Sequence, residues 1–194
     1  MVRILHAADF HLDSAFRALS PEQARQRRAE SRRTAARLVE YGNDHGTELL
    51  LLAGDLFDSD NLYGQTAQEL ADALGRFRGR VFIAPGNHDF YAAHGPWGAA
   101  AWPENVHIFT SGRPVCVDVP ELGCAVWGAA FTAAEEADGS ALTAVRCPDD
   151  GRTHLMVLHA DLSAPDSRYR PITPAQIGET GLSYLALGHT HAFS

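Results

Sequence analysis

Five short apolar runs recur along the chain, and each is followed at once by side chains that can bind metal ions. The runs have the length of buried strands rather than of helices. They cover residues 3–5, 48–53, 81–84, 155–158 and 182–187. Because ligands of an open α/β sheet bind beyond the carboxyl ends of its strands, the polar residues at these five ends predict a single site.

The sequence predicts four helices between and after these strands, and capping patterns mark three of them. The first begins with Ser20 as its cap, Pro21 in its first turn and Gln23 completing a capping box, and it ends near Gly42. The other predicted helices follow a capping box of Thr66 and Glu69, cover residues 132–145 with a break at 138–139, and follow a cap at residues 173–176.

The middle of the chain is predicted to be rich in strands. Residues 106–109 form one of them, and residues 115–119 and 124–127 form a hairpin. Cys116 and Cys124 flank the turn of this hairpin, so a disulfide between them is one interpretation. Small buried hydrophobic side chains are the alternative, which a reducing compartment favours for all three cysteines of the chain.

Strands that alternate with helices, together with a central hairpin, predict two packed β-sheets with helices outside them. The 194 residues are 45% hydrophobic and 21% charged, which is typical of one compact domain that spans residues 1–194. No apolar stretch has the length to cross a bilayer. The chain also runs from Met1 directly into its first strand without room for a signal peptide, so a cytoplasmic protein with no membrane contact is predicted.

Carboxylate, amide and imidazole groups make up the predicted site. Seven of them lie at the strand ends: Asp9, His11, Asp55, Asn87, His159, His189 and His191. That number of oxygen and nitrogen ligands is enough for two divalent ions with open positions. Mixed ligation of this kind suits manganese, iron or zinc better than calcium, and manganese is the ion we expect.

The motifs around these residues resemble those of the calcineurin-like metallophosphoesterases. In chain order they read Asp9-x-His11, Gly54-Asp55-x-x-Asp58, Gly86-Asn87-His88-Asp89, His159 and Gly188-His189-x-His191. The resemblance spans residues 4–191, and residues 6–14 and 53–58 look most like the bacterial SbcD-like DNA-repair exonucleases. It implies an α/β fold, a four-layer αββα sandwich of two mixed β-sheets flanked by helices.

The resemblance also implies a role for each residue of the site. One ion is held by Asp9, His11 and His191, the other by Asn87, His159 and His189, and Asp55 bridges both. His88 stands beside the leaving-group oxygen as proton donor or transition-state stabiliser. Asp58 is at the position that often supplies the anion that orients His88, although some nucleases of this branch carry His there. Asp89 is expected to support its loop.

The implied activity is metal-dependent hydrolysis of phosphodiester bonds, as a DNA exonuclease or endonuclease of the SbcD-like type with an SbcC-like ATPase as partner. A phosphomonoesterase or a small-nucleotide phosphodiesterase is the alternative, because the superfamily shares the ligand set. A non-catalytic scaffold is a third hypothesis, but a scaffold would be expected to lose His88 or a ligand.

The position of the C-terminus departs from the family pattern. The chain ends three residues after His191, whereas family members usually continue into further strands. This difference predicts either an unfinished second sheet or a catalytic-core fragment.

The charge of the chain bears on the DNA hypothesis. A net charge of −8 is unlike the basic footprint of a general nucleic-acid binder. The first helix carries six arginines that offer a phosphate-binding patch, but only Arg25, Arg28 and Arg32 form a row. Their spread around the helix favours a solvated surface instead.

Two other segments are candidates for substrate contact. The aromatic residues Phe90, Tyr91 and Trp97 offer a stacking surface for a base, with core packing as the favoured alternative. The polar loop 163–171 offers phosphate contacts through Asp166, Arg168, Tyr169 and Arg170.

Overall fold

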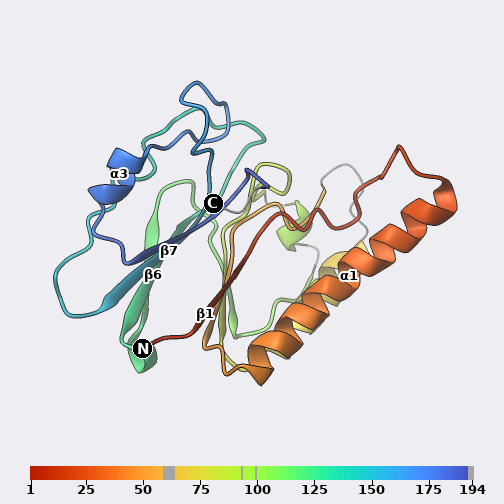
Figure 1. Cartoon of the computed structure of the whole chain (residues 1–194), viewed down its shortest axis with the longest axis horizontal. Helices are drawn as coiled ribbons and strands as arrows, with labels where there is room; N and C mark the ends of the chain where they lie inside the picture. Colours follow the sequence, from red (N-terminus) through yellow and green to blue (C-terminus); the bar gives the residue numbers. More distant parts are fainter. Residues whose placement is uncertain (59–63, 93, 99, 192–194) are drawn as a thin grey trace.

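Two four-stranded β-sheets form the centre of the protein, as a computed structural model of the chain shows (Figure 1). The structure describes residues 1–58, 64–92, 94–98 and 100–191. The helices are α1 (Pro21–Asp44), α2 (Gly64–Gly75), α3 (Pro174–Gly178) and the 3₁₀ turns η2 (Pro96–Gly98) and η3 (Pro120–Leu122). The strands are β1 (Ile4–Ala7), β2 (Leu49–Leu52), β3 (Arg80–Ile83), β4 (Val106–Ile108), β5 (Val115–Val119), β6 (Cys124–Ala129), β7 (Thr153–His159) and β8 (Tyr184–Gly188).

The two sheets differ in how their strands pair. The predicted α/β fold of two sheets flanked by helices is confirmed. The first sheet has the order β1-β2-β3-β4 and is parallel throughout rather than mixed. The second has the order β5-β6-β7-β8 and is mixed, because β5 runs antiparallel to β6 while β6, β7 and β8 are parallel. In a parallel sheet each strand returns through a crossover, which places the ends of β1, β2 and β3 at one edge.

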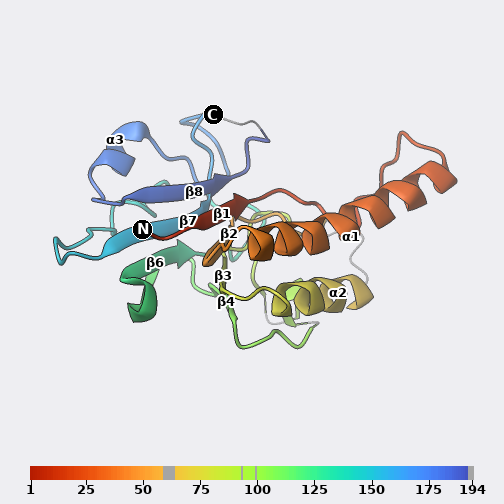
Figure 2. The ribbon, with the colours of Figure 1, turned by 60° about the horizontal axis from the view of Figure 1, so that its bottom comes forward.

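Successive side chains of β2, an inner strand of the first sheet, point alternately into two layers of the core. Leu50 and Leu52 of β2 pack with residues of α1 and α2 on the outer face of the first sheet. Leu49 and Leu51 point the other way, into the layer between the two sheets. All four leucines are fully buried, as expected of a parallel strand covered on both faces. Figure 2 shows α1 and α2 side by side to the right of the first sheet, and α3 on the opposite side of the molecule, near β8 of the second sheet.

The helix α1 begins and ends as its sequence signals predict. The Ser20 hydroxyl accepts from the Gln23 N–H, and the Gln23 side chain accepts from the Ser20 N–H. The first turns of the helix extend beyond the rest of the molecule (Figure 1). Of its arginine row, Arg32 is engaged with the buried carboxylate of Asp13, to which its Nε donates at 2.9 Å.

The helix predicted over residues 132–145 is absent, and turns take its place. The backbone of Glu136 pairs instead with a distant loop, since its N–H donates to the Arg168 carbonyl at 2.8 Å and its carbonyl accepts from the Arg170 N–H at 2.6 Å. This tertiary pairing removes backbone groups that a helix would need. The capping box of Thr66 and Glu69 is also wrong, because α2 begins at Gly64 and Thr66 lies buried inside it.

The predicted hairpin is confirmed, but its cysteines do not face each other. Cys116 lies opposite Trp127, and Cys124 lies opposite Val119. All three cysteines are free thiols, and Cys124 is fully buried. Within the described part of the chain, none of the helices has the length and apolar character needed to cross a membrane.

A buried arginine fastens the loop that follows β7. The side chain of Arg170 is 1% exposed, forms an ion pair with Glu136 and donates to the Ala130 carbonyl at 2.7 Å. Its guanidinium lies 4.4 Å from the centre of the Phe131 ring. The phosphate contact predicted for Arg170 is therefore wrong, because its charge is used inside the protein.

Replacement of Arg170 should be far more damaging than replacement of its neighbour. Arg170→Ala leaves the Glu136 carboxylate without its buried partner and should lower the free energy of unfolding by about 3–5 kcal/mol. Arg168→Ala removes an exposed pair with Glu135 and should cost less than about 1 kcal/mol. Urea denaturation of both variants measures the difference, and equal losses would contradict the buried role.

Candidate metal centre

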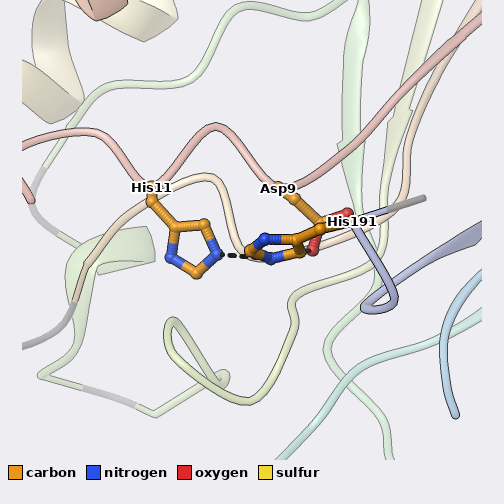
Figure 3. A group of neighbouring side chains, drawn as sticks. All are labelled: Asp9, His11 and His191. Atoms are coloured by element: carbon orange, nitrogen blue, oxygen red, sulfur yellow. Dashed lines mark hydrogen bonds and ion pairs between the residues drawn. The ribbon is translucent and has the colours of Figure 1, made fainter.

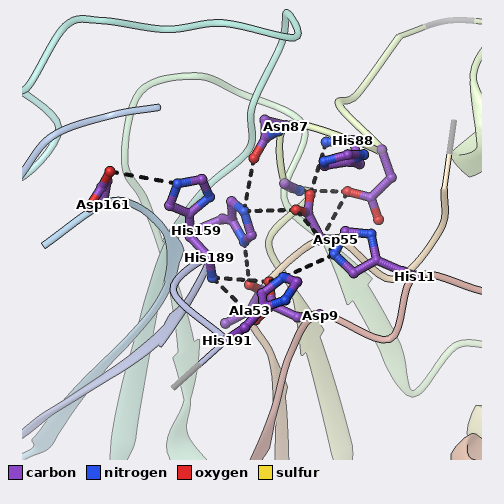
Figure 4. Close-up of polar contacts among 12 residues, drawn as sticks. Asp9, His11, Ala53, Asp55, Asn87, His88, His159, Asp161, His189 and His191 are labelled. Carbon is purple, nitrogen blue, oxygen red and sulfur yellow. Dashed lines mark hydrogen bonds and ion pairs between the residues drawn. The ribbon is translucent and has the colours of Figure 1, made fainter. Parts of the chain in front are cut away.

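The predicted ligands come together at the carboxyl ends of five strands (Figure 4). Loops after β1 and β2 run side by side beyond the strands, because the Asp9 N–H donates to the Gly54 carbonyl at 3.0 Å and the His11 N–H donates to the Asp55 carbonyl at 2.9 Å. The other ligands follow β3, end β7 and follow β8: Asn87, His159, His189 and His191.

One group of ligand atoms is formed by Asp9, His11 and His191, which all lie within 4.8 Å of one another (Figure 3). The Nε2 atoms of His11 and His191 are 3.2 Å apart, and His191 Nε2 is 3.4 Å from Asp9 Oδ1. Two imidazole nitrogens that face each other across such a short distance are arranged as ligands of a shared cation would be. This is the set that the family resemblance assigns to the first ion.

A second group is formed by Asp55, His159 and His189, again within 4.8 Å. His159 Nε2 lies 3.2 Å from Asp55 Oδ2 and 3.1 Å from Asn87 Oδ1. His159 is fully buried and Asn87 is 8% exposed, so polar atoms converge here with little access to water. These are the residues that the resemblance assigns to the second ion and to the bridge.

Asp55 lies between the two groups. Its Oδ2 is 3.2 Å from His159 Nε2 and 3.8 Å from His11 Nε2. Burial acts to raise the pKa of Asp55, but the hydrogen bond and charge of His159 outweigh it, so the pKa lies below its usual value. The same contact raises the pKa of His159 despite the cost of burying that ring. A carboxylate in this position can reach ions on both sides.

His88 lies at the open side of the cluster. Its backbone N–H donates to Asp55 Oδ1 at 2.9 Å, and its ring meets the His11 ring edge-on with 4.8 Å between centres. A ring nitrogen of His88 also lies within 4.8 Å of ligand atoms of His11 and Asp55. The side chain is exposed, so a substrate can approach it.

The predicted partner of His88 is not brought to it. Among the described residues, Asp58 makes no hydrogen bond or ion pair with His88; its N–H donates to the Leu12 carbonyl at 3.0 Å. The orienting role of Asp58 therefore stays a prediction. Every other predicted site residue lies in the cluster.

Backbone atoms and a glycine fix the orientation of His159. Its Nδ1–H donates to the Ala53 carbonyl at 2.8 Å, which leaves Nε2 facing Asp55 and Asn87. Gly54 adopts a left-handed φ of +83°, and a Cβ atom there would lie 2.5 Å from His159 Nδ1. Only glycine allows the chain to pass this close to the ring.

The buried carboxylate of Asp89 supports the loops of the site, as predicted. It accepts from the N–H groups of Gly86, Leu56, Asp55 and Phe57 at 2.6, 2.8, 3.2 and 3.3 Å. Burial and the nearby Asp55 carboxylate raise the pKa of Asp89 to about 7, while the backbone donors act against that rise. Asp89 therefore ties the β2 and β3 loops together.

Two residues near the ligands were not assigned to the metal site by their sequence pattern. Asp161 is 7% exposed and places Oδ2 3.7 Å from His189 Nε2. The Tyr169 ring lies 5.1 Å from the His189 ring. Asp161 follows His159 by two residues at the end of β7, and that spacing is the signal that could have revealed it.

The aromatic residues after Asp89 pack inside the protein. Trp97 is 3% exposed, its Nε1–H donates to the Asp89 carbonyl, and its ring contacts Phe57. Tyr91 packs against the same core cluster. Core packing is therefore confirmed for these two residues, and Trp97 has no free face for a base.

The donor set fits divalent transition-metal ions. Imidazole nitrogens and carboxylate oxygens suit manganese, iron and zinc, and the ligand atoms of each group already lie within 4.8 Å of one another. Asp9, His11 and His191 would hold one ion, while Asp55, His159, His189 and Asn87 surround the second position.

Fold and site together define a metallophosphoesterase. Residues 2–193 match the calcineurin-like phosphoesterase family, and the chain belongs to that family. Members of the family are metal-dependent hydrolases of phosphoesters that bind divalent ions.

Two named proteins are similar to the chain. The "Uncharacterized metallophosphoesterase YhaO" of Bacillus subtilis (strain 168) is 33% identical over 198 residues, which cover 96% of this chain and 48% of YhaO. The "Putative phospholipase B-like 3" of Caenorhabditis elegans is 38% identical over 69 residues, 34% of this chain and 12% of that protein. The chain thus spans less than half the length of either relative.

Alanine at Gly54 should disturb the metal centre beyond its effect on the backbone. Gly54 and Gly151 both have a left-handed φ, +83° and +77°, but a Cβ at Gly151 would meet nothing within 4 Å. Gly54→Ala and Gly151→Ala should share a backbone cost of roughly 1–2 kcal/mol. Only Gly54→Ala should also displace His159 and lower the manganese content measured after equilibrium dialysis. Equal metal content in the two variants would refute this role of Gly54.

Proposed function

We propose that the chain hydrolyses phosphodiester bonds of nucleic acid with two divalent ions, manganese first among them. The observation that carries this proposal is the place of Asp55, whose Oδ2 lies 3.8 Å from a ligand atom of one group and 3.2 Å from a ligand atom of the other. A single ion has no need of two ligand groups joined by a carboxylate. Asp55 is thus the proposed bridge.

The remaining ligands divide between the two positions. Asp9, His11 and His191 would hold one ion, and Asn87, His159 and His189 would hold the other. Two ions in these positions would supply an activated water and neutralise charge on the phosphoryl oxygens. The chain itself orients the ligands. The Ala53 carbonyl accepts from Nδ1–H of His159 and fixes the orientation of that ring, and Asp9 accepts from the His189 N–H at 3.1 Å.

His88 is the proposed proton donor to the leaving oxygen. It is exposed, its backbone is fixed by Asp55 Oδ1, and its ring stands beside His11 at the mouth of the cluster. A group there can contact a substrate oxygen without giving up a ligand position. Asp58 remains its proposed orienting anion, which requires the two side chains to approach when substrate binds.

The open site favours a polymeric phosphodiester as the substrate. His88 is exposed, and the side chain of His191 is 59% exposed. A groove of about 430 Å³ beside the site is lined by the ends of β1 and β8 and by the residues that follow them. A chain of nucleotides can cross such a surface. The likeness of residues 6–14 and 53–58 to SbcD-like nucleases supports DNA as that polymer.

Tight binding of DNA should require a partner. The net charge is −8, and Arg32 of the arginine row on α1 is occupied by Asp13. Non-specific DNA affinity comes mainly from basic side chains that contact phosphates, so the chain alone should bind weakly and lose binding as salt rises. An SbcC-like ATPase is the proposed source of the missing affinity.

The same acidic character favours a second candidate, a phosphatase acting on small monoesters or nucleotides. Purified chain with manganese should be offered single- and double-stranded DNA, bis-p-nitrophenyl phosphate and p-nitrophenyl phosphate, with a chelator as control. Cleavage of DNA and of the diester supports the proposal. Rapid hydrolysis of the monoester with intact DNA would assign the function to the phosphatase.

His88→Ala should separate metal binding from turnover. Removal of a general acid typically costs about 10²–10⁴-fold in rate, while the ligand groups stay intact. Diesters with a p-nitrophenolate leaving group need less protonation and should lose less than DNA. His94→Ala, which changes an exposed histidine outside the cluster, is the matched control. Loss of metal from His88→Ala would overturn the assignment.

A further inference from the structure

Asp161 is anchored at the edge of the metal centre by backbone contacts on both sides. Its N–H donates to the Tyr169 carbonyl at 3.0 Å, and its carbonyl accepts from the Ile172 N–H at 2.9 Å. The buried Arg170 lies between these two partners and fixes the same loop to Glu136. The position of the Asp161 side chain is therefore set by the fold rather than by a flexible loop.

The two carboxylate oxygens of Asp161 have different surroundings. Oδ1 accepts from the Ser163 N–H at 2.8 Å, from the Ser163 hydroxyl at 2.7 Å and from the Ala164 N–H at 3.2 Å. Oδ2 faces His189 Nε2 at 3.7 Å. Figure 4 shows Asp161 on the side of the His189 ring that lies away from His159 and Asp55.

The backbone of His189 is fixed, but its ring needs a separate orienting partner. Its φ is +109°, a strained value, and its N–H is held by both Asp9 oxygens at 3.1 and 3.2 Å. That contact fixes its backbone and not its ring. The last torsion of a histidine side chain has broad, roughly two-fold minima, so a ring flip exchanges a nitrogen for a carbon at the ligand position.

We propose that Asp161 is a positioning residue that accepts a hydrogen bond from Nε2–H of His189 and so reserves Nδ1 of that ring for the metal ion. The inference rests on the proposed metal centre. The two nitrogens of an imidazole point in widely different directions, so an acceptor behind Nε2 turns Nδ1 toward Asp55 and His159. A ring shift of about 1 Å brings Nε2 and Oδ2 to hydrogen-bond distance. The Tyr169 ring at 5.1 Å and the His159 ring at 5.2 Å flank His189 and limit its other movements.

Asp161→Asn tests this role with little change in shape. The amide oxygen can keep the Ser163 and Ala164 contacts, while the amide NH₂ then faces Nε2 and cannot accept from it. The variant should therefore favour the other tautomer of His189, with the proton on Nδ1. Asp166→Asn makes the same change of charge at an exposed position of the same loop and serves as the matched control.

Two measurements test the role of Asp161, namely the tautomer of His189 and the affinity for manganese. In the metal-free wild type, nitrogen NMR of the histidine rings should show His189 protonated on Nε2, and Asp161→Asn should reverse this. Manganese titration by calorimetry should show one of the two positions weakened by about 10–100-fold in Asp161→Asn, as is usual for loss of a residue that orients a metal ligand, and neither in Asp166→Asn.

The failures of the two proposals can be told apart. A wild-type His189 protonated on Nδ1, or unchanged manganese affinity in Asp161→Asn, would refute the role of Asp161 while leaving the metal centre standing. A wild type that binds no manganese but shows the Nε2–H tautomer would refute the metal centre alone. The wild-type NMR measurement needs no variant, so it still decides the role of Asp161 if Asp161→Asn does not fold.

Discussion

The hydrogen bonds of one buried carboxylate hold the metal centre in shape. Asp89 accepts four backbone N–H groups, one from Gly86 and three from residues 55–57, and so joins the loops after β2 and β3. Trp97 donates to the Asp89 carbonyl and fixes the same residue from the other side. Together with the bond from the His88 N–H to Asp55 Oδ1, this junction fixes the distance between Asp55 and Asn87. The bridging geometry proposed for Asp55 therefore depends on a residue that need not touch a metal ion.

Backbone strain is concentrated at the ligands. Asp9, His11, Asp55, His189 and His191 all have a positive φ, between +42° and +109°. Each such residue costs about 1–3 kcal/mol and persists only where the surrounding structure enforces it. Parallel strands enforce it here, since pairing continues past β1 and β2 into the ligand loops. The sharp turns direct side chains from separate strands toward one point.

Much of the fold and site could be predicted because the signals were local. An apolar run of strand length followed by Asp or His needs no knowledge of the rest of the chain, and all five such runs are strands in the structure. The helix expected at residues 132–145 failed because Glu136 pairs with the distant loop at 168–170. The phosphate contact expected of Arg170 is wrong for the same reason, because only the tertiary structure places Glu136 and Phe131 beside its guanidinium. The spacing of Asp161 from His159 could indicate a place near the site, but its contact with His189 depends on β7 and β8 being neighbours.

The distribution of charge explains why an acidic protein is suited to this chemistry. In the described part of the chain, Arg32 pairs with Asp13 and Arg170 pairs with Glu136, so neither arginine is engaged with a ligand carboxylate. Among the described contacts of the cluster, Asp55 pairs with His159 and accepts from the His88 N–H, while Asp9 accepts from the His189 N–H. Protons and divalent cations compete for the same atoms in such a site. Because its carboxylates are paired with imidazoles and backbone donors rather than with arginines, such a centre leaves positive charge to be supplied by the ions that the proposed reaction requires.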